Sequence, residues 1–193
     1  MNQSKKAAIS GIVGVIAYFI AVALFLITKF DWALTLWEIM TVAGGVLEAA
    51  ILIAVTDKTE MNSLWQNFMK LSLTGMLILT SLAHFTSIGV VRPLAAQGLD
   101  IPEYFKIGAF PSLEMTTDYT AWGFFMGLAF MCLYFGITKI KVMKILSGIC
   151  TGLCFIGFIG SFFNESLWYF APWGYGGGFL IMCIYMLRKA DKK

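Results

Sequence analysis

Residues Ala7 to Thr28 read AAISGIVGVIAYFIAVALFLIT, an apolar stretch that contains no charged side chain. The hydrocarbon core of a bilayer is about 30 Å thick, and a helix needs about 20 apolar residues to cross it. The stretch follows Lys5 and Lys6, as the core of a signal peptide does, but it is too long for such a core and lacks a convincing small-residue cleavage site. It is therefore interpreted as a retained first transmembrane helix.

Five further apolar stretches follow the first, and the six together fill the chain. They are predicted as helices at about residues 33–56, 68–90, 119–138, 142–163 and 167–187. Of the 193 residues, 59% are hydrophobic and 13% are charged, whereas a soluble domain carries about 25% charged residues. The sequence therefore predicts an all-α fold, with one six-helix transmembrane domain over residues 1–193 and a long loop at 91–118 between helices three and four.

The distribution of basic residues predicts the orientation, because lysine and arginine near helix ends remain on the cytoplasmic side. With the amino terminus inside, eleven of the 14 basic residues fall in cytoplasmic segments, and Lys29, Arg92 and Lys106 fall outside. The chain is thus predicted in the inner (cytoplasmic) membrane with both termini in the cytoplasm. Six acidic residues fall on the outer side, where the resulting negative charge would attract cations. The alternative is that acidic residues are neutral with respect to topology.

Two pairs of glycines predict a close contact between neighbouring helices. Gly123 and Gly127 lie on the fourth predicted helix, and Gly148 and Gly152 lie on the fifth. The two helices are joined by a short turn, and small residues at this spacing let helix backbones approach closely in lipid. We predict that this hairpin is the tightest packing in the bundle.

No cofactor is predicted. The cysteines, Cys132, Cys150, Cys154 and Cys183, all lie in apolar stretches and are interpreted as small packing residues. Cys150 and Cys154 share a helix face, but no second pair of ligands lies near them to complete a metal site, and a single histidine excludes a haem held between two histidines. Nucleotide-binding, hydrolase and nucleic-acid-binding patterns are absent from the sequence. The predicted partners are membrane lipid and a small cationic or amphipathic ligand, and a homo-oligomer stays open.

Three ionisable residues lie inside the predicted helices: Glu38, Glu48 and His84. Such a group near the middle of a bilayer costs several kcal/mol unless it is paired, hydrated or neutralised. Glu48 follows Gly44 and Gly45, which weaken the helix and admit water or a neighbouring backbone, and a lone carboxyl there would carry a proton near neutral pH. The alternative is a protonated Glu48 that only hydrogen-bonds a hydroxyl group of another helix. Glu38 and His84 fall at similar depths on antiparallel helices and are predicted to pair.

Further candidate ligand-binding residues lie toward the outer side: Glu114, Asp118, Asn164, Glu165, Trp37, Trp122 and Trp168. An interfacial aromatic belt explains tryptophans at this level without any ligand, and it also accounts for Trp32 and Trp173. The competing interpretation is a pocket whose tryptophan faces bind a flat or cationic molecule.

The loop at 91–118 is predicted to have a function of its own. Pro93, Pro102 and Pro111 exclude one continuous helix there, since proline lacks an amide donor. The stretch 101–113 is amphipathic enough to lie on the membrane or to dip into the bundle as a cap. A loop of this length in so small a protein is often functional.

Three functions fit these residues. The first, and the preferred one, is a protein that binds or transports a small cationic or amphipathic molecule in an outward-facing cavity, with proton exchange on Glu48 as the coupling step. The second is an integral-membrane enzyme that acts on a lipid through His84 and an acidic partner, Glu38 or Glu114. The third is a non-catalytic partner, such as a sensor, immunity or assembly subunit, whose polar residues only hold helices together.

Overall fold

The structure consists of helices joined by turns and short loops in the part of the chain that it describes. The computed structural model covers residues 3–56, 59, 61–105 and 110–190, and no strand occurs among them. Six helices are long and apolar enough to cross a membrane, and we number them as spans one to six: Lys5–Thr28, Asp31–Thr56, Ser63–Ala96, Leu113–Gly136, Lys141–Ser161 and Glu165–Arg188. The predicted fold class, an all-α bundle with six membrane-spanning helices, is confirmed at this level.

Spans one and two form a tight antiparallel hairpin. α1 (Gln3–Thr28) and α2 (Asp31–Thr56) are separated only by Lys29 and Phe30. Lys29 has a φ of 57°, which is the left-handed conformation often found in sharp reversals of the chain. Its amide donates a hydrogen bond to the carbonyl of Phe25 at 2.8 Å, which satisfies one of the free carbonyls at the end of α1. α1 therefore folds back and packs along α2.

Span three continues past its predicted end at residue 90. It consists of α3 (Ser63–Thr86), the π-helical turn η1 (Ser87–Val91) and α4 (Arg92–Ala96). It begins at Asn62, whose side chain accepts a hydrogen bond from the amide of Leu64 at 2.8 Å. Pro93 has no amide to donate, and the wider π turn before it lets the helix continue. The prediction that the loop begins at residue 91 is therefore wrong, and Arg92 is helical.

Span four begins before its predicted start at residue 119. It consists of α5 (Leu113–Tyr119), the π-helical η3 (Thr120–Phe125) and α6 (Met126–Gly136). The Ser112 hydroxyl accepts a hydrogen bond from the amide of Met115 at 3.1 Å, the arrangement typical of a helix N-terminus. The loop between spans three and four is consequently shorter than predicted.

This loop contains one 3-10 turn, η2 (Glu103–Phe105). Of the amphipathic stretch at 101–113, residues 106–109 lie outside the described residues. The ring of Phe110 stacks on that of Tyr119, with centroids 5.4 Å apart. The last part of the loop therefore turns back onto the start of span four.

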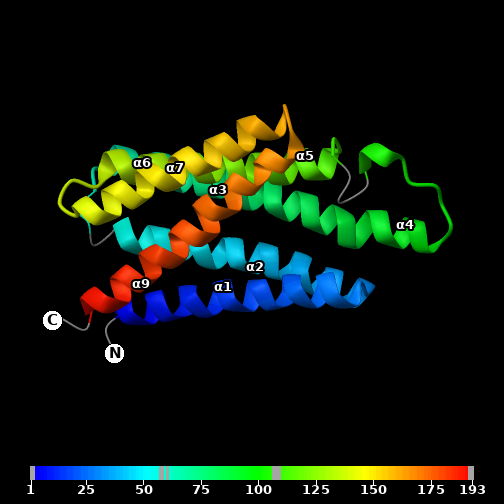
Figure 1. Ribbon diagram of the computed structural model, residues 1–193, viewed down its shortest axis with the longest axis horizontal. Coiled ribbons are helices and arrows are strands. Elements are labelled where there is room, and N and C mark those ends of the chain that lie inside the picture. The colour runs from blue at the N-terminus through cyan, green and yellow to red at the C-terminus, as the bar shows by residue number, and fades with distance from the viewer. Residues whose placement is uncertain (1–2, 57–58, 60, 106–109, 191–193) are drawn as a thin grey trace.

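Span six changes its packing partner along its length. Span five is α7 (Lys141–Ser161), and span six consists of η4 (Glu165–Tyr169), α8 (Phe170–Pro172), the π-helical η5 (Trp173–Gly178) and α9 (Phe179–Ala190). η4, α8 and η5 pack on α7, whereas α9 packs on α1. In Figure 1 this is the orange-to-red helix that starts beside α7 and crosses the bundle to reach α1.

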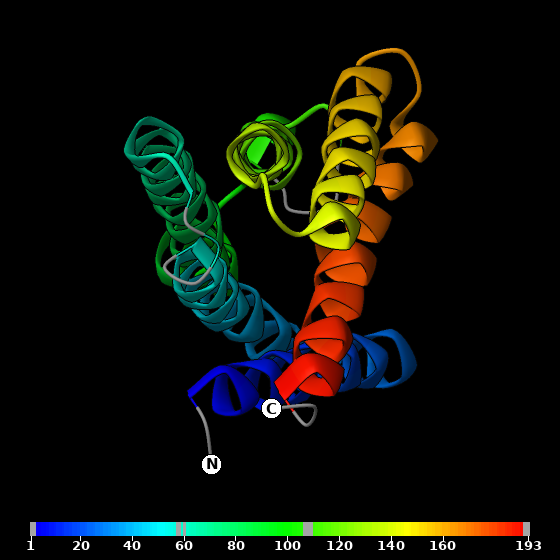
Figure 2. The same cartoon turned by 90° about the vertical axis from the view of Figure 1, so that its left-hand side faces the viewer.

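The spans form a ring when the bundle is viewed along its axis (Figure 2). α1 contacts α2, α2 contacts α3, α3 contacts α6 and α6 contacts α7, and span six closes the ring between α7 and α1. Both termini lie at one end of the bundle, which we call the terminal end (Figure 1). The opposite, distal end holds residues 29–30, 97–105, 110–112 and 162–164.

The predicted glycine contact between spans four and five is found in part. A Cβ atom at Gly123 would lie 2.6 Å from the Cβ of Phe158, and one at Gly127 would lie 3.2 Å from the Cβ of Cys154. These two glycines therefore let span four approach α7 closely. At Gly152, however, a Cβ atom would meet no atom within 4 Å, so this glycine makes no such contact.

The closest glycine contacts with a neighbouring backbone join span six to α7. A Cβ atom at Gly157 would lie 2.5 Å from the amide nitrogen of Ala171, and one at Gly174 would lie 2.9 Å from the carbonyl oxygen of Cys150. Backbone atoms cannot move aside as side chains do. The prediction that the hairpin of spans four and five is the tightest packing is therefore wrong, because span six approaches α7 more closely.

The core and the outer surface are both apolar. Large side chains such as Leu52, Met76, Met126 and Phe130 are fully buried, and the four cysteines are free and buried among the spans. Large apolar side chains are also exposed along every span, far beyond the patches that a soluble protein carries. Such a surface fits a lipid environment.

We expect Gly157→Leu to destabilise the bundle by about 1–3 kcal/mol, because the backbone of Ala171 leaves no room for a side chain. Gly152→Leu, on the same helix but facing open space, is the matched control and should change stability little. Labelling of the four buried cysteines by a thiol-reactive dye during heating measures the stability of both variants. An equal loss of stability in the two variants would contradict the proposed packing of span six on α7.

Candidate functional site

A cavity of about 540 Å³ lies between spans one and two on one side and spans four and six on the other. This volume falls in the range of small-molecule sites, about 300–1,000 Å³. Most of the lining is apolar or aromatic. The lining residues in the described part of the chain also include Glu48, His84, Asp118 and Glu165, but no lysine or arginine.

The cavity is elongated along the bundle axis. Its lining residues on α1 extend from Leu26, near the distal end, to Gly11, and those on α2 extend from Trp37 to Glu48. At a rise of 1.5 Å per residue, positions 11 and 26 lie about 22 Å apart. The cavity therefore reaches from the distal third of the spans past their middle.

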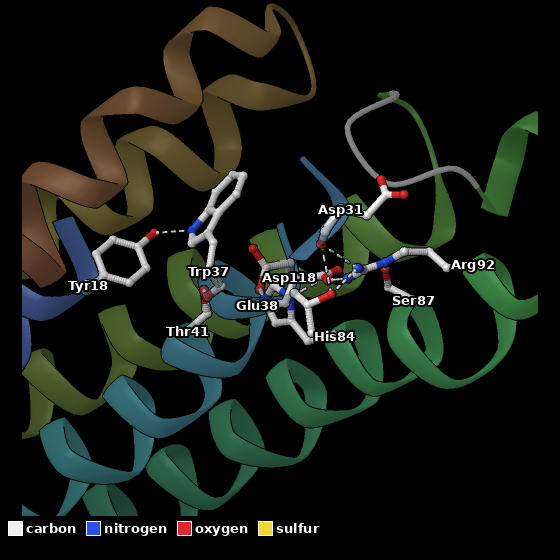
Figure 3. Close-up of polar contacts among 10 residues, drawn as sticks. Tyr18, Asp31, Trp37, Glu38, Thr41, His84, Ser87, Arg92 and Asp118 are labelled. Carbon is white, nitrogen blue, oxygen red and sulfur yellow. Dashed lines mark hydrogen bonds and ion pairs between the residues drawn. The ribbon is translucent and has the colours of Figure 1, made fainter. Parts of the chain in front are cut away.

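Glu38 and Arg92 form an ion pair beside the distal part of the cavity. Glu38 is 2% exposed on α2, and its Oε2 pairs with Nη2 of Arg92. The Arg92 Nη1 also donates a hydrogen bond to Thr35 Oγ1 at 2.6 Å, and Nε donates one to Ser87 Oγ at 3.5 Å. Figure 3 shows the Arg92 side chain reaching from span three toward Glu38 on α2. The pair therefore ties spans two and three together and compensates the buried charge of Glu38.

His84 lies between two carboxylates (Figure 3). Its Nε2 is 3.4 Å from Oδ1 of Asp118, and its Nδ1 is 4.0 Å from Oε1 of Glu38. Neither ring nitrogen has a hydrogen-bond partner among the described residues. The predicted neighbours Glu38 and His84 are thus brought to ion-pair distance, but the closer partner of the imidazole is Asp118. The ring connects spans two, three and four.

Glu114 is buried next to this group. Neither of its carboxyl oxygens has a hydrogen-bond partner in the described part of the chain. His84 and Arg92 are the basic residues near it. Glu114 is not among the lining residues of the cavity.

Glu48 lies at the other end of the cavity, remote from these charges. It is 6% exposed, and its Oε1 has no hydrogen-bond partner among the residues described. Gly44, one turn away, also lines the cavity, and a Cβ atom there would meet nothing within 4 Å. A buried carboxyl without a partner is stable when it holds a proton or when a cation lies beside it. Glu48 is thus chemically able to exchange a proton for a cation.

Aromatic rings form the walls between the two polar ends. Tyr119 stacks on Trp168 with ring centroids 3.9 Å apart, and Trp122 packs against Tyr175 at 4.7 Å. All four rings line the cavity. The face of an aromatic ring attracts a cation, so these walls are suited to a molecule that is both apolar and positively charged.

Most of the predicted ligand-binding residues line this one cavity: Glu48, His84, Asp118, Glu165, Trp37, Trp122 and Trp168. Glu38 and Glu114 are buried beside it. Asn164 does not take part, because it is exposed and its side chain accepts a hydrogen bond from the amide of Ser166 at 3.0 Å as the cap of η4. Trp32 and Trp173 are exposed, as the aromatic-belt interpretation predicts.

Two contributors to the site were not among the predicted ligand-binding residues. Arg92 was assigned to the loop at 91–118, whose prolines were taken to exclude one continuous helix. Tyr18 lies in the middle of the apolar first span, and its hydroxyl accepts a hydrogen bond from Trp37 Nε1 at 3.2 Å (Figure 3). The available signal was the hydroxyl itself, since a polar group at this depth needs a partner.

No group of three or more histidine, cysteine or acidic side chains in the described ranges is arranged to hold a metal ion. No protein-family model, curated protein or solved structure matches the chain. The function is therefore argued from the geometry of the cavity.

We expect Arg92→Met to destabilise the bundle by about 2–3 kcal/mol, because it leaves the buried Glu38 without its partner. The double variant Glu38→Gln/Arg92→Met should recover much of this loss, since no unpaired charge remains. Unfolding by sodium dodecyl sulfate in mixed micelles gives the free energies for the double-mutant cycle. If the losses of the two single variants simply add, the ion pair does not contribute to stability.

Proposed function

We propose that this protein binds an amphipathic molecule with a positive charge and transports it across the membrane in exchange for a proton. The observation that carries the proposal is Glu48, a buried carboxyl at the deep end of the cavity whose Oε1 has no hydrogen-bond partner among the described residues. A positively charged group would satisfy such a carboxylate. A proton satisfies it in the absence of that group.

The charges around the cavity support a cationic rather than an anionic ligand. Apart from tyrosines, the ionisable lining residues in the described part of the chain are three carboxyls and one imidazole. Arg92 is the nearby permanent cation, and Glu38 already pairs with it. The field in the cavity therefore attracts cations and repels anions.

The remaining lining supports a ligand with an apolar body. Aromatic and aliphatic side chains separate Glu48 from Asp118 and Glu165. An inorganic cation has no apolar surface to bury against such walls, whereas a molecule with an apolar or aromatic body buries its surface against them and also gains cation–π contacts.

These features favour the transport proposal over the other two functions. A purely structural role for the polar residues requires neither a cavity nor a carboxyl oxygen without a partner. An enzyme that uses His84 with Glu38 or Glu114 needs the acidic partner within hydrogen-bond reach or bridged by one water. Glu38 Oε1 is 4.0 Å from His84 Nδ1, and neither ring nitrogen has a hydrogen-bond partner among the described residues.

We expect tetraphenylphosphonium, a lipophilic aromatic cation, to bind the protein in lipid nanodiscs and to release a proton. Glu48→Gln should weaken binding about tenfold or more, a loss of about 1.4 kcal/mol, and abolish the proton release, because glutamine neither ionises nor attracts a cation. Calorimetry in buffers of different ionisation enthalpy measures both quantities.

The control for this experiment is Asp100→Asn, which removes a negative charge from the exposed distal loop. It should leave the affinity and the proton release unchanged. Equal affinities of the wild type and Glu48→Gln would rule out Glu48 as the exchanging group.

The proposal also places the protein in the inner membrane, with the terminal end of the bundle on the cytoplasmic side. Eleven of the 14 basic residues belong by sequence to the terminal side, which basic residues favour when it is cytoplasmic. Glu165 and Asp118 then face the outer side, where the cavity would accept its ligand.

We expect green fluorescent protein fused after the last residue to fluoresce, because it folds in the cytoplasm and not after export in unfolded form. Alkaline phosphatase inserted after Gly98, in the distal loop, should be active, because it requires the outer compartment. Dark fusions at the carboxyl terminus together with inactive phosphatase at the loop would reverse the assigned orientation.

A further inference from the structure

We infer that the ligand is a single-chain cationic amphiphile whose hydrocarbon tail stays in the bilayer, passing out between α1 and span six, while its charged head moves along the cavity. This inference rests on the proposed function and adds the class of ligand and its access route. It is carried by the divergence of span six from α1 and by the exposure of the residues on both sides of the gap.

Span six touches α1 through its terminal half. A Cβ atom at Gly11 of α1 would lie 2.5 Å from Sγ of Cys183 and 3.3 Å from the ring of Phe179, so α9 and α1 are in close contact there. Toward the distal end, η5, α8 and η4 pack on α7 instead, and Figure 1 shows span six moving away from α1 along this direction. Span six and α1 are therefore separated toward the distal end, which leaves a gap in the ring of spans.

The residues at this gap face the cavity and the outer surface at once. Phe19 and Leu26 on α1 line the cavity but are 57% and 55% exposed, and Tyr169 on span six lines it and is 68% exposed. Side chains of a closed wall would be buried. The cavity therefore opens sideways, at a level where lipid chains surround the bundle.

A lateral opening serves a molecule that carries a long tail. Withdrawing such a tail from lipid is unfavourable in proportion to its length, and an opening along α1 makes the withdrawal unnecessary. Only the head then needs the cavity. This condition matches a cavity with the volume of a small-molecule site that carries carboxyls toward both ends.

The carboxyls mark two positions for the head. Asp118 and Glu165 lie near the distal starts of spans four and six, whereas Glu48 lies 17 residues beyond the first residue of α2, about 25 Å along the helix. The rings of Trp122, Tyr175 and other aromatic residues also line the cavity, and an aromatic ring is able to bind a quaternary ammonium group over its face. A cationic head can thus move from one carboxyl to the next without meeting a lysine or arginine among the described lining residues.

Gly176 on η5 offers a way to close the opening. It lines the cavity, and a Cβ atom there would meet no atom within 4 Å. A phenylalanine at this position therefore extends into open space and does not clash with a neighbouring backbone. Gly152 on α7 has the same open space but does not line the cavity, which makes it the matched control.

The test uses two quaternary ammonium probes that carry a nitroxide on the head group, one with a hexadecyl chain and one with a methyl group in its place. Ascorbate added outside proteoliposomes reduces the exposed nitroxides, and electron paramagnetic resonance follows the transfer of the head across the membrane. The wild type should speed transfer of the hexadecyl probe several-fold over protein-free vesicles and transfer the methyl probe much more slowly.

Gly176→Phe should reduce transfer of the hexadecyl probe to the protein-free rate, whereas Gly152→Phe should retain it. Thermal unfolding of each variant shows whether it is folded. If the Gly176→Phe variant unfolds, the dependence of transfer on chain length in the wild type still decides the test.

Three outcomes would overturn the inference. The first is transfer of the methyl probe as fast as that of the hexadecyl probe, and the second is a folded Gly176→Phe variant with wild-type transfer of the hexadecyl probe. The third is failure of the wild type to transfer the hexadecyl probe. The proposed function is tested separately with tetraphenylphosphonium, which has no long chain, and it fails if the binding and the proton release are independent of Glu48.

Discussion

A carboxyl group in the apolar part of a membrane must be paired, hydrated or protonated, and this bundle meets the requirement differently at two of its buried glutamates, Glu38 and Glu48. Glu38 is paired with Arg92, which reaches it because span three stays helical through Pro93. The pair fixes the distal part of span three against α2 and engages the arginine nearest to the cavity. Glu48 lies too far along α2 to share it. The negative character of the cavity follows from this division.

The shape of the cavity follows from how the glycines of spans five and six are placed. Gly157 and Gly174 bring α7 and the distal part of span six to backbone contact, and Gly11 brings α9 and α1 together near the terminal end. Span six cannot satisfy both contacts and remain parallel to α1, so it crosses the bundle obliquely. The space between α1 and the distal half of span six belongs to the cavity. Close packing at two places thus produces open space at a third.

The sequence predicts what depends on local composition. Six spans follow from apolar stretches long enough to cross a bilayer, and Glu38, Glu48 and His84 stand out because each interrupts such a stretch. The ends of spans three and four were misplaced because a π turn before Pro93 and the cap at Ser112 decide them. The pairing of His84 with Asp118 could not be derived, because depth along a helix can be read from a sequence but the face that meets a given neighbour depends on the whole bundle.

In the proposed mechanism the same isolation of Glu48 makes exchange obligatory. With a proton the carboxyl is neutral and compatible with its apolar surroundings, and with a cationic head beside it the site is again neutral. The ionised carboxylate alone carries an uncompensated buried charge, and the protonated acid beside a cation leaves the cation without its counter-charge. Both of these states cost several kcal/mol in a poorly hydrated cavity. A carboxyl with a permanent partner, as Glu38 has in Arg92, would not have to hold either a proton or the ligand. The absence of a basic side chain from the described lining of the cavity is therefore what would couple the movement of the proton to that of the cationic ligand.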